Sequence, residues 1–159
     1  MVQSISVSCK TNLPAERLII LKLLIVWALF AAAQPGTPPE AADRARRAME
    51  DGRFNEAVEI YENLLKADAS NVGLVMNLGL ALDGAEKPRE AIARFERAIK
   101  LDPNLVPAYL ASGECWRKLS EPAKALLAFE HALAIEPRSR KIHLELADTH
   151  YGMGHFERA

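Results

Sequence analysis

The residues that come closest to a metal site are the histidines. The chain has four, all near its carboxyl end: His131, His143, His150 and His155. His143 and His150 are seven residues apart, so a helix would carry both imidazoles on one face. However, no HExxH spacing accompanies them, and 34 residues earlier the same positions hold Tyr109 and Trp116, which are typical packing residues. We therefore predict that the histidines are structural and that the protein binds no metal and no other cofactor.

Nucleophilic chemistry has equally little support. Ser112 and Ser120 are isolated from any base and orienting group, and neither a glycine-rich phosphate loop nor a GxSxG elbow is present in the sequence. The two cysteines, Cys9 and Cys115, form no CxxC pair. Cys115 is predicted to be a small buried hydrophobic residue on a helix, and Cys9 lies in a segment that we expect to be removed. The sequence thus predicts a protein that is not an enzyme.

The composition favours helices and excludes one class of partner. Of the 159 residues, 50% are hydrophobic and 26% are charged, with alanine and leucine prominent. Those two residue types suit close-packed helices better than sheets. The formal net charge of −1 gives no basic face of the kind that binds nucleic acid, so no nucleic-acid partner is expected.

The amino-terminal segment has the pattern of a secretory signal peptide. Lys10 and Arg17 precede an apolar run at 18–33, which ends in three alanines. Small residues of this kind form a cleavage site, here before Gln34. Residues 1–33 are therefore predicted to be a targeting helix that export removes.

An uncleaved membrane anchor is the alternative for the same segment. A spanning helix needs about 20 apolar residues, which the run approaches, and Lys22 within it could reach towards the interface. The protein would then contact the membrane only through residues 18–33. In either case the rest of the chain is expected outside the cytoplasm, in the periplasm or secreted, after an extended proline-rich linker at 34–40.

A 34-residue period governs the chain after the linker. It is clearest in two series of residues: Ala57, Ala91, Ala125 and Ala159, and Tyr61, Phe95 and Phe129. A fixed period of this length is typical of stacked repeats, and hydrophobic residues at helical spacing divide each period into two helices. Pro88 and Pro122 stand where second helices are expected to begin, because the first helical turn tolerates proline. The predicted fold class is all-α.

The repeating positions resemble those of the tetratricopeptide repeat. Its signature is matched by Leu78, Gly79, Leu82, Ala91, Phe95, Ala98 and Pro103, and one unit later by Tyr109, Gly113, Trp116, Ala125, Phe129, Ala132 and Pro137. The resemblance covers residues 41–159 and implies a right-handed superhelical solenoid of antiparallel helix pairs. Repeats are expected at about 38–71, which is degenerate, at 72–105 and 106–139, and in part at 140–159.

Complementary side-chain sizes explain the signature. Gly79 is expected to face small residues such as Ala91, so that two helix backbones approach closely, while Phe95 fills the space between this pair and the next. Gly113 and Phe129 are expected to do the same one unit later.

The resemblance also implies a binding surface. If the signature residues face neighbouring helices, each first helix leaves one stripe exposed, and in the family these stripes line a concave groove that holds a peptide or helix of a partner. The predicted groove residues are Met76, Asn77, Leu80, Asp83, Leu110, Glu114, Arg117, Leu144, Asp148 and Tyr151. Alternatively, the apolar members only complete the packing between first helices.

One mode of binding in the family is not expected here. Some members hold a carboxyl-terminal carboxylate through Lys, Asn and Arg on successive first helices. Asn77 is the only match, because Pro107 and Ala111 stand at the equivalent positions of the next unit. Capture of a chain terminus is therefore excluded from the predicted functions.

The predicted function is that of a protein–protein interaction scaffold or adaptor. The alternative is a repeat arm of a larger exported or membrane-anchored enzyme whose catalytic part lies outside this sequence. Because Ala159 falls on a signature position early in a further second helix, more chain is expected after it.

Overall fold

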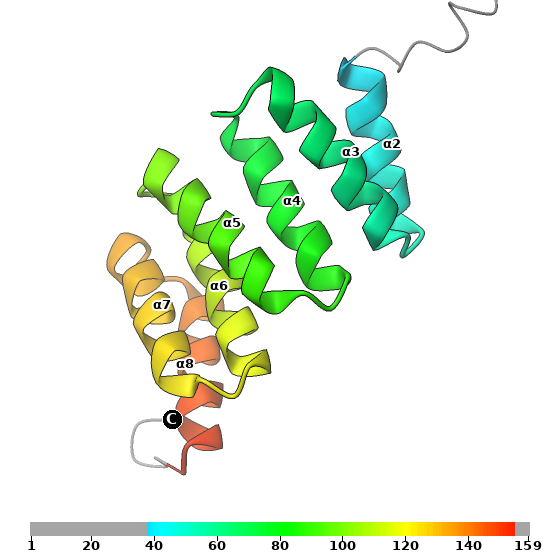
Figure 1. Ribbon diagram of the computed structural model, residues 1–159. Coiled ribbons are helices and arrows are strands. Elements are labelled where there is room, and N and C mark those ends of the chain that lie inside the picture. The colour runs from blue at the N-terminus through cyan, green and yellow to red at the C-terminus, as the bar shows by residue number, and fades with distance from the viewer. Residues whose placement is uncertain (1–37, 155–159) are drawn as a thin grey trace, which may run out of the picture. The chain divides into compact units, whose positions relative to one another are not determined.

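A computed structural model describes residues 38–154, and this part of the chain consists of helices joined by short turns, without strands. The helices are α2 (Pro38–Glu50), α3 (Phe54–Ala67), α4 (Val72–Gly84), α5 (Pro88–Leu101), α6 (Val106–Lys118), α7 (Pro122–Ile135) and α8 (Arg140–Gly152) (Figure 1). The predicted all-α class is confirmed. The predicted targeting helix lies outside the described residues, and the right-handed sense of the superhelix stays a prediction. No helix between residues 38 and 154 is long and apolar enough to cross a membrane.

Local sequence explains where the helices begin. Pro88 and Pro122 are the first residues of α5 and α7, as predicted, and Pro107 stands in the first turn of α6. Proline at these positions loses no hydrogen bond, because the first N–H groups of a helix have no partner within it. At the start of α4, the side chain of Asn71 accepts a hydrogen bond from the Leu74 N–H at 3.1 Å.

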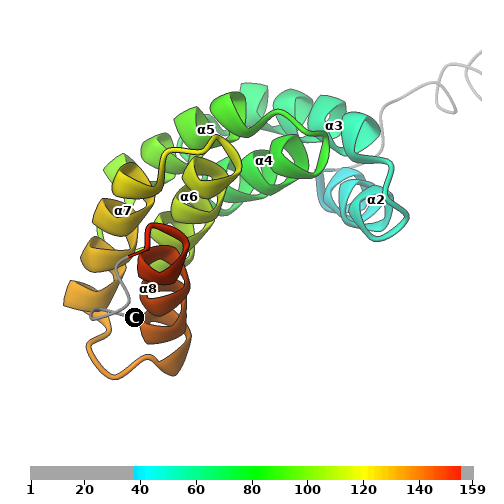
Figure 2. The same cartoon turned by 90° about the horizontal axis from the view of Figure 1, so that it is seen from below.

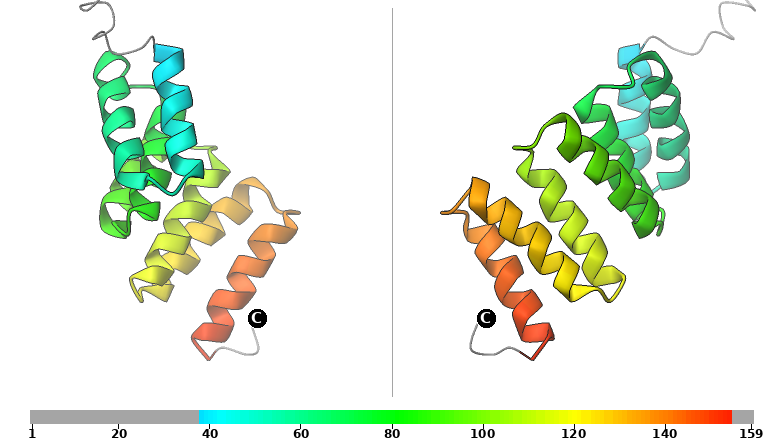
Figure 3. Two further views of the ribbon diagram at one scale, coloured as in Figure 1. Left: turned by 90° about the vertical axis from the view of Figure 1, so that its right-hand side faces the viewer. Right: turned by 60° about the vertical axis from the view of Figure 1, so that its left-hand side comes forward.

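The helices form two layers along a curve. In Figure 2, the first helices of the pairs (α2, α4, α6 and α8) lie on its inner side, and the second helices (α3, α5 and α7) lie on its outer side. Each helix packs against the next along the chain, and α4 also contacts α6. The views in Figure 3 show the same side-by-side stacking of consecutive helices. The inner layer therefore presents a row of first helices to one side of the array.

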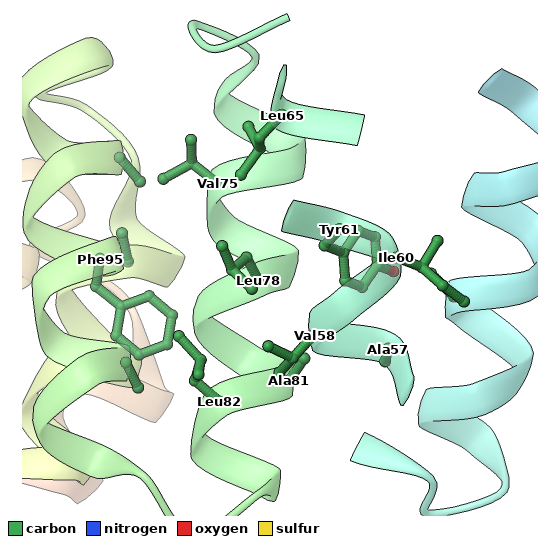
Figure 4. Close-up of a cluster of buried hydrophobic side chains, with 14 of the residues drawn as sticks. Ala57, Val58, Ile60, Tyr61, Leu65, Val75, Leu78, Ala81, Leu82 and Phe95 are labelled. Atoms are coloured by element: carbon green, nitrogen blue, oxygen red, sulfur yellow. The ribbon is translucent and has the colours of Figure 1, made fainter. Parts of the chain in front are cut away.

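The core lies between these layers. Leu78, Leu82 and Phe95 are almost completely buried, and Figure 4 shows them facing one another between α4 and α5. Phe129 and Ile142 are equally buried one unit later. Each such side chain stabilises the fold by about 1.5–3 kcal/mol through the apolar surface that it removes from water.

Each buried phenylalanine lies against a glycine of its own pair. A Cβ atom added to Gly79 would lie 2.4 Å from Cε1 of Phe95, and one added to Gly113 would lie 2.4 Å from Cε1 of Phe129. The predicted close approach at these glycines is therefore present, but the prediction was wrong about the nearest partner, which is the ring and not Ala91 or the equivalent alanine. The aromatic ring fills the space within a pair.

A third contact of this kind was missed by the sequence analysis. A Cβ on Gly84, at the end of α4, would lie 2.4 Å from Cδ1 of Phe54 at the start of α3. This contact joins one pair to the next. It escaped notice because Phe54 stands where later units have proline, so the 34-residue comparison gave no signal for it.

The turn inside each unit requires a left-handed residue. Gly52, Glu86, Ser120 and Gly154 have φ angles of 74°, 59°, 59° and 76°, and they are 34 residues apart. At two of these turns the residue that follows closes the helix end, with the Lys87 N–H bonded to the Leu82 carbonyl and the Glu121 N–H to the Trp116 carbonyl, both at 2.9 Å. A side chain with a Cβ is strained at positive φ, so the turns at Glu86 and Ser120 carry a cost that glycine avoids.

We expect Glu86→Gly to raise the free energy of unfolding by about 1 kcal/mol, because it removes this strain. Gly52→Ala should lower it by a similar amount for the same reason, since a Cβ at Gly52 meets no atom within 4 Å and only the backbone is affected. Chemical denaturation followed by circular dichroism measures both changes. A loss of stability in Glu86→Gly would contradict the assignment of strain to this turn.

Candidate functional site

The inner side of the array contains a hollow of about 460 Å³ between α4, α6 and the loop that precedes α8, which we call the central hollow. Its apolar lining consists of Met76, Leu80, Val106, Pro107, Leu110 and Ala111. Its polar lining consists of Glu114, Glu136, Ser139 and Lys141. The hollow thus combines an apolar floor with charged groups at one end of the described array's inner face.

Helical geometry explains how these side chains come together. Met76 and Leu80 are four residues apart on α4, and Leu110 and Glu114 occupy the equivalent positions on α6. Leu80 is 39% exposed, whereas Leu110 is only 8% exposed. Leu110 is therefore the buried floor of the hollow, and Leu80 is the leucine with apolar surface left to give to a ligand.

The predicted groove residues do not form one continuous surface. Met76, Leu80, Leu110 and Glu114 line the central hollow. Asn77 lines a separate hollow of about 280 Å³ among α2, α3 and α4.

Further along the array, Arg117 and Asp148 line a third hollow of about 320 Å³ near the ends of α6 and α8. Leu144 and Tyr151 are 60% and 65% exposed on α8. The structure therefore divides the predicted stripe into separate surfaces, of which the central hollow has the largest apolar share.

Two of the predicted groove charges are already paired with neighbouring first helices. The Lys118 ammonium lies 2.7 Å from Asp83 Oδ1 and 2.8 Å from Asp83 Oδ2, so it joins α6 to α4. Arg117 donates to Glu145 at 2.5 Å and so joins α6 to α8, and its guanidinium also lies 5.4 Å from the ring centre of Phe129. These pairs hold the inner helices together, and their charge is less available to a ligand than the sequence analysis expected.

Cys115 is buried, as predicted, and it is also bonded to Asp83. Its Sγ donates to Asp83 Oδ1 at 3.3 Å. Burial, and then the negative charge of Asp83, raises the pKa of the thiol from 9.0 to about 12. The same Asp83 raises the pKa of Lys118 through its hydrogen bond. The thiol stays protonated at neutral pH and is no nucleophile there.

The histidines take structural positions. His143 Nε2 lies 3.0 Å from the carbonyl oxygen of Pro137, and 34 residues earlier the Tyr109 hydroxyl donates to the carbonyl of Pro103 at 3.3 Å. The ring of His131 stacks on Tyr109 with the ring centres 5.7 Å apart. Within residues 38–154, no three His, Cys, Asp or Glu side chains are placed to hold a metal ion, and His155 lies outside this range.

The loop before α8 supplies lining residues that the sequence analysis missed, namely Glu136 and Ser139. The analysis considered only the exposed stripes of first helices. Glu136 ends α7 and Ser139 precedes α8, so both lie beside the inner face although neither belongs to a first helix. The charge at this position of the period was the available signal.

Comparison with known proteins supports the helix arrangement. The sequence profile of the tetratricopeptide repeat matches residues 48–111, from the end of α2 to the middle of α6. No curated protein sequence matches the chain. The crystal structure of MamA aligns with a TM-score of 0.73 at 22% identity, covering 83% of this chain and 77% of that one.

Two solved structures of peptide complexes are also similar. The first tetratricopeptide-repeat domain of Spaghetti (RPAP3), bound to the HSP90 peptide SRMEEVD, aligns with a TM-score of 0.68 at 21% identity, covering 74% of this chain and 93% of that one. The second such domain of human RPAP3, in complex with the HSP70 peptide SGPTIEEVD, has a TM-score of 0.65 at 27% identity and covers 71% and 98%. These likenesses agree with the two layers of helices in Figure 2.

Proposed function

Because residues 48–111 belong to the tetratricopeptide-repeat family, we propose that this protein is a scaffold that binds a short segment of another protein in the central hollow. The observation that carries the proposal is the apolar floor of the hollow on the inner side of the array, with Leu80 partly exposed above it. A mixture of apolar surface and charge suits a peptide segment better than a small molecule. The peptide complexes of similar domains support this choice of ligand.

The packing alternative applies to some of the lining and not to all of it. Leu110 is 8% exposed, so its main contribution is to the core. Leu80 keeps 39% of its surface exposed even though α6 and α8 follow it in the stack. Apolar surface that the array itself leaves uncovered at a hollow is what a partner segment would bury.

The bound segment is not proposed to be a chain terminus. Pro107 and Ala111, which stand where a carboxylate-binding site would need polar side chains, are part of the apolar lining of the central hollow. Neither side chain can donate a hydrogen bond to a carboxylate. Asn77, the one matching residue, lines a different hollow. An internal segment of the partner fits this surface better.

The test of binding compares two leucines that differ in position. Peptides are selected from a displayed random-peptide library on the immobilised full chain, and their affinities are then measured for the wild type, Leu80→Glu and Leu127→Glu. Leu80→Glu should weaken binding about tenfold, because it places a charge against the apolar part of the ligand. Leu127→Glu makes the same change at a leucine that is 59% exposed on the outer helix α7, and it should bind like the wild type.

Circular dichroism should show that both variants keep their helices, since both leucines are exposed. Equal affinity of the wild type and Leu80→Glu for the selected peptides would contradict the proposal. A specific loss in Leu127→Glu would move the site to the outer helices.

We further propose that the scaffold acts outside the cytoplasm, in the periplasm or secreted. The support is the basic and apolar pattern of residues 1–33, with Lys10 and Arg17 ahead of the run at 18–33. Mass spectrometry of protein from a secreting host should show a new amino terminus near Gln34. An intact chain bound to membranes would favour the anchor instead, and an intact soluble chain in the cytoplasm would contradict both forms of the proposal.

A further inference from the structure

Glu136 occupies a position that is used differently in the two preceding units. Asp68 and Asp102, at 34-residue intervals before it, also end second helices. The Asp68 carboxylate accepts hydrogen bonds from the Ser70 hydroxyl at 3.3 Å and the Asn71 amide at 3.1 Å. The Asp102 carboxylate accepts one from the Asn104 N–H at 3.0 Å. Both aspartates therefore shape the loop that follows them.

The Glu136 carboxylate does no such work. Within the described residues, its side chain makes no hydrogen bond and no ion pair, and it lines the central hollow. A carboxylate at the carboxyl end of a helix is also unfavourable, because the peptide dipoles place partial negative charge there. Glu136 thus carries a negative charge that the fold neither neutralises nor uses, at the edge of an apolar surface.

The charges of the hollow do not cancel. Its lining contains Glu114 and Glu136 against one cation, Lys141. Lys141 Nζ lies 3.9 Å from Glu114 Oε1, the outer limit of an ion pair, and these side chains are 63% and 40% exposed. Such a pair contributes little by itself. The lining therefore has an excess of one negative charge beside its apolar floor.

From this charge and this floor we propose that the segment bound in the central hollow is basic and apolar: its apolar side chains cover Leu80 and Met76, and an adjacent lysine or arginine pairs with Glu136. This inference rests on the proposed function and specifies the partner's chemistry. The segment then differs in sign of charge from SRMEEVD and SGPTIEEVD, the peptides bound by the similar domains. Complementary charge would contribute mainly to orientation and to selection among partners.

The test uses the same library selection on the immobilised full chain. Lysine and arginine should be enriched over aspartate and glutamate among the selected peptides, relative to the starting library. In the tightest peptide, replacing its basic residue by glutamate should weaken binding about tenfold, and replacing it by glutamine about threefold. Raising the salt concentration should reduce these differences without abolishing binding.

Glu136→Gln identifies the residue responsible. This change keeps the size of the side chain, and it should weaken binding of the basic peptide about threefold while leaving its glutamine version unaffected. Glu130→Gln is the matched control, since Glu130 is exposed on the same helix and outside the lining of the hollow. It should bind both peptides like the wild type.

The possible outcomes separate this inference from the proposed function. Peptides that bind through Leu80 without any preference for basic residues would overturn the inference alone. Failure to select any peptide would overturn the proposed function with it. Sedimentation of the free chain should show a monomer; a dimer that Leu80→Glu dissociates would place a second copy in the hollow and overturn the inference.

Discussion

A phenylalanine ring from each of two second helices lies directly against a glycine of the first helix in its own pair, and the stacking of the array depends on this contact. Phe95 occupies the space that a side chain at Gly79 would need, and Phe129 does the same at Gly113. Both rings are fully buried, so neither can move aside without opening the core. The contact fixes how closely the two helices of a pair approach, and it thereby fixes where the opposite face of each first helix lies.

That opposite face forms the inner side of the curve, where the chain differs from one unit to the next. The glycine and phenylalanine recur at the 34-residue period, but the charges that join the inner helices do not. Asp83 pairs with Lys118 between α4 and α6, whereas Arg117 pairs with Glu145 between α6 and α8. The recurring contact therefore builds the scaffold, and the variable inner residues, including Glu136, give each step of the surface its own chemistry.

The fold could be predicted further than the surface because the period records packing that every unit repeats. Pro88 and Pro122 marked helix starts by local chemistry alone, and Phe95 and Phe129 marked the core through their recurrence. The ring contacts of Gly79 and Gly113 were harder to assign, because spacing identifies a close approach without identifying the side chain that fills it.

The surface was predicted only in part. Asp83 and Arg117 were assigned to a ligand, yet each has a partner on the next first helix, at a separation that the period does not mark. Glu136 reaches the central hollow through the course of the α7–α8 loop, which depends on how the two helices pack. Pairings and loop paths of this kind are tertiary properties, and a helical stripe drawn on each helix separately does not contain them.

The central claim is that the glycine–phenylalanine contact sets the spacing of each helix pair, and a double-mutant cycle on Gly79 and Phe95 tests it most directly. Gly79→Ala alone should cost about 1–3 kcal/mol of unfolding free energy, because the new methyl group collides with the buried ring. In a Phe95→Leu background the same substitution should cost at least about 1 kcal/mol less, since the smaller side chain leaves room for it. Costs that simply add would show that the glycine and the ring do not constrain each other, and would contradict this account of the fold.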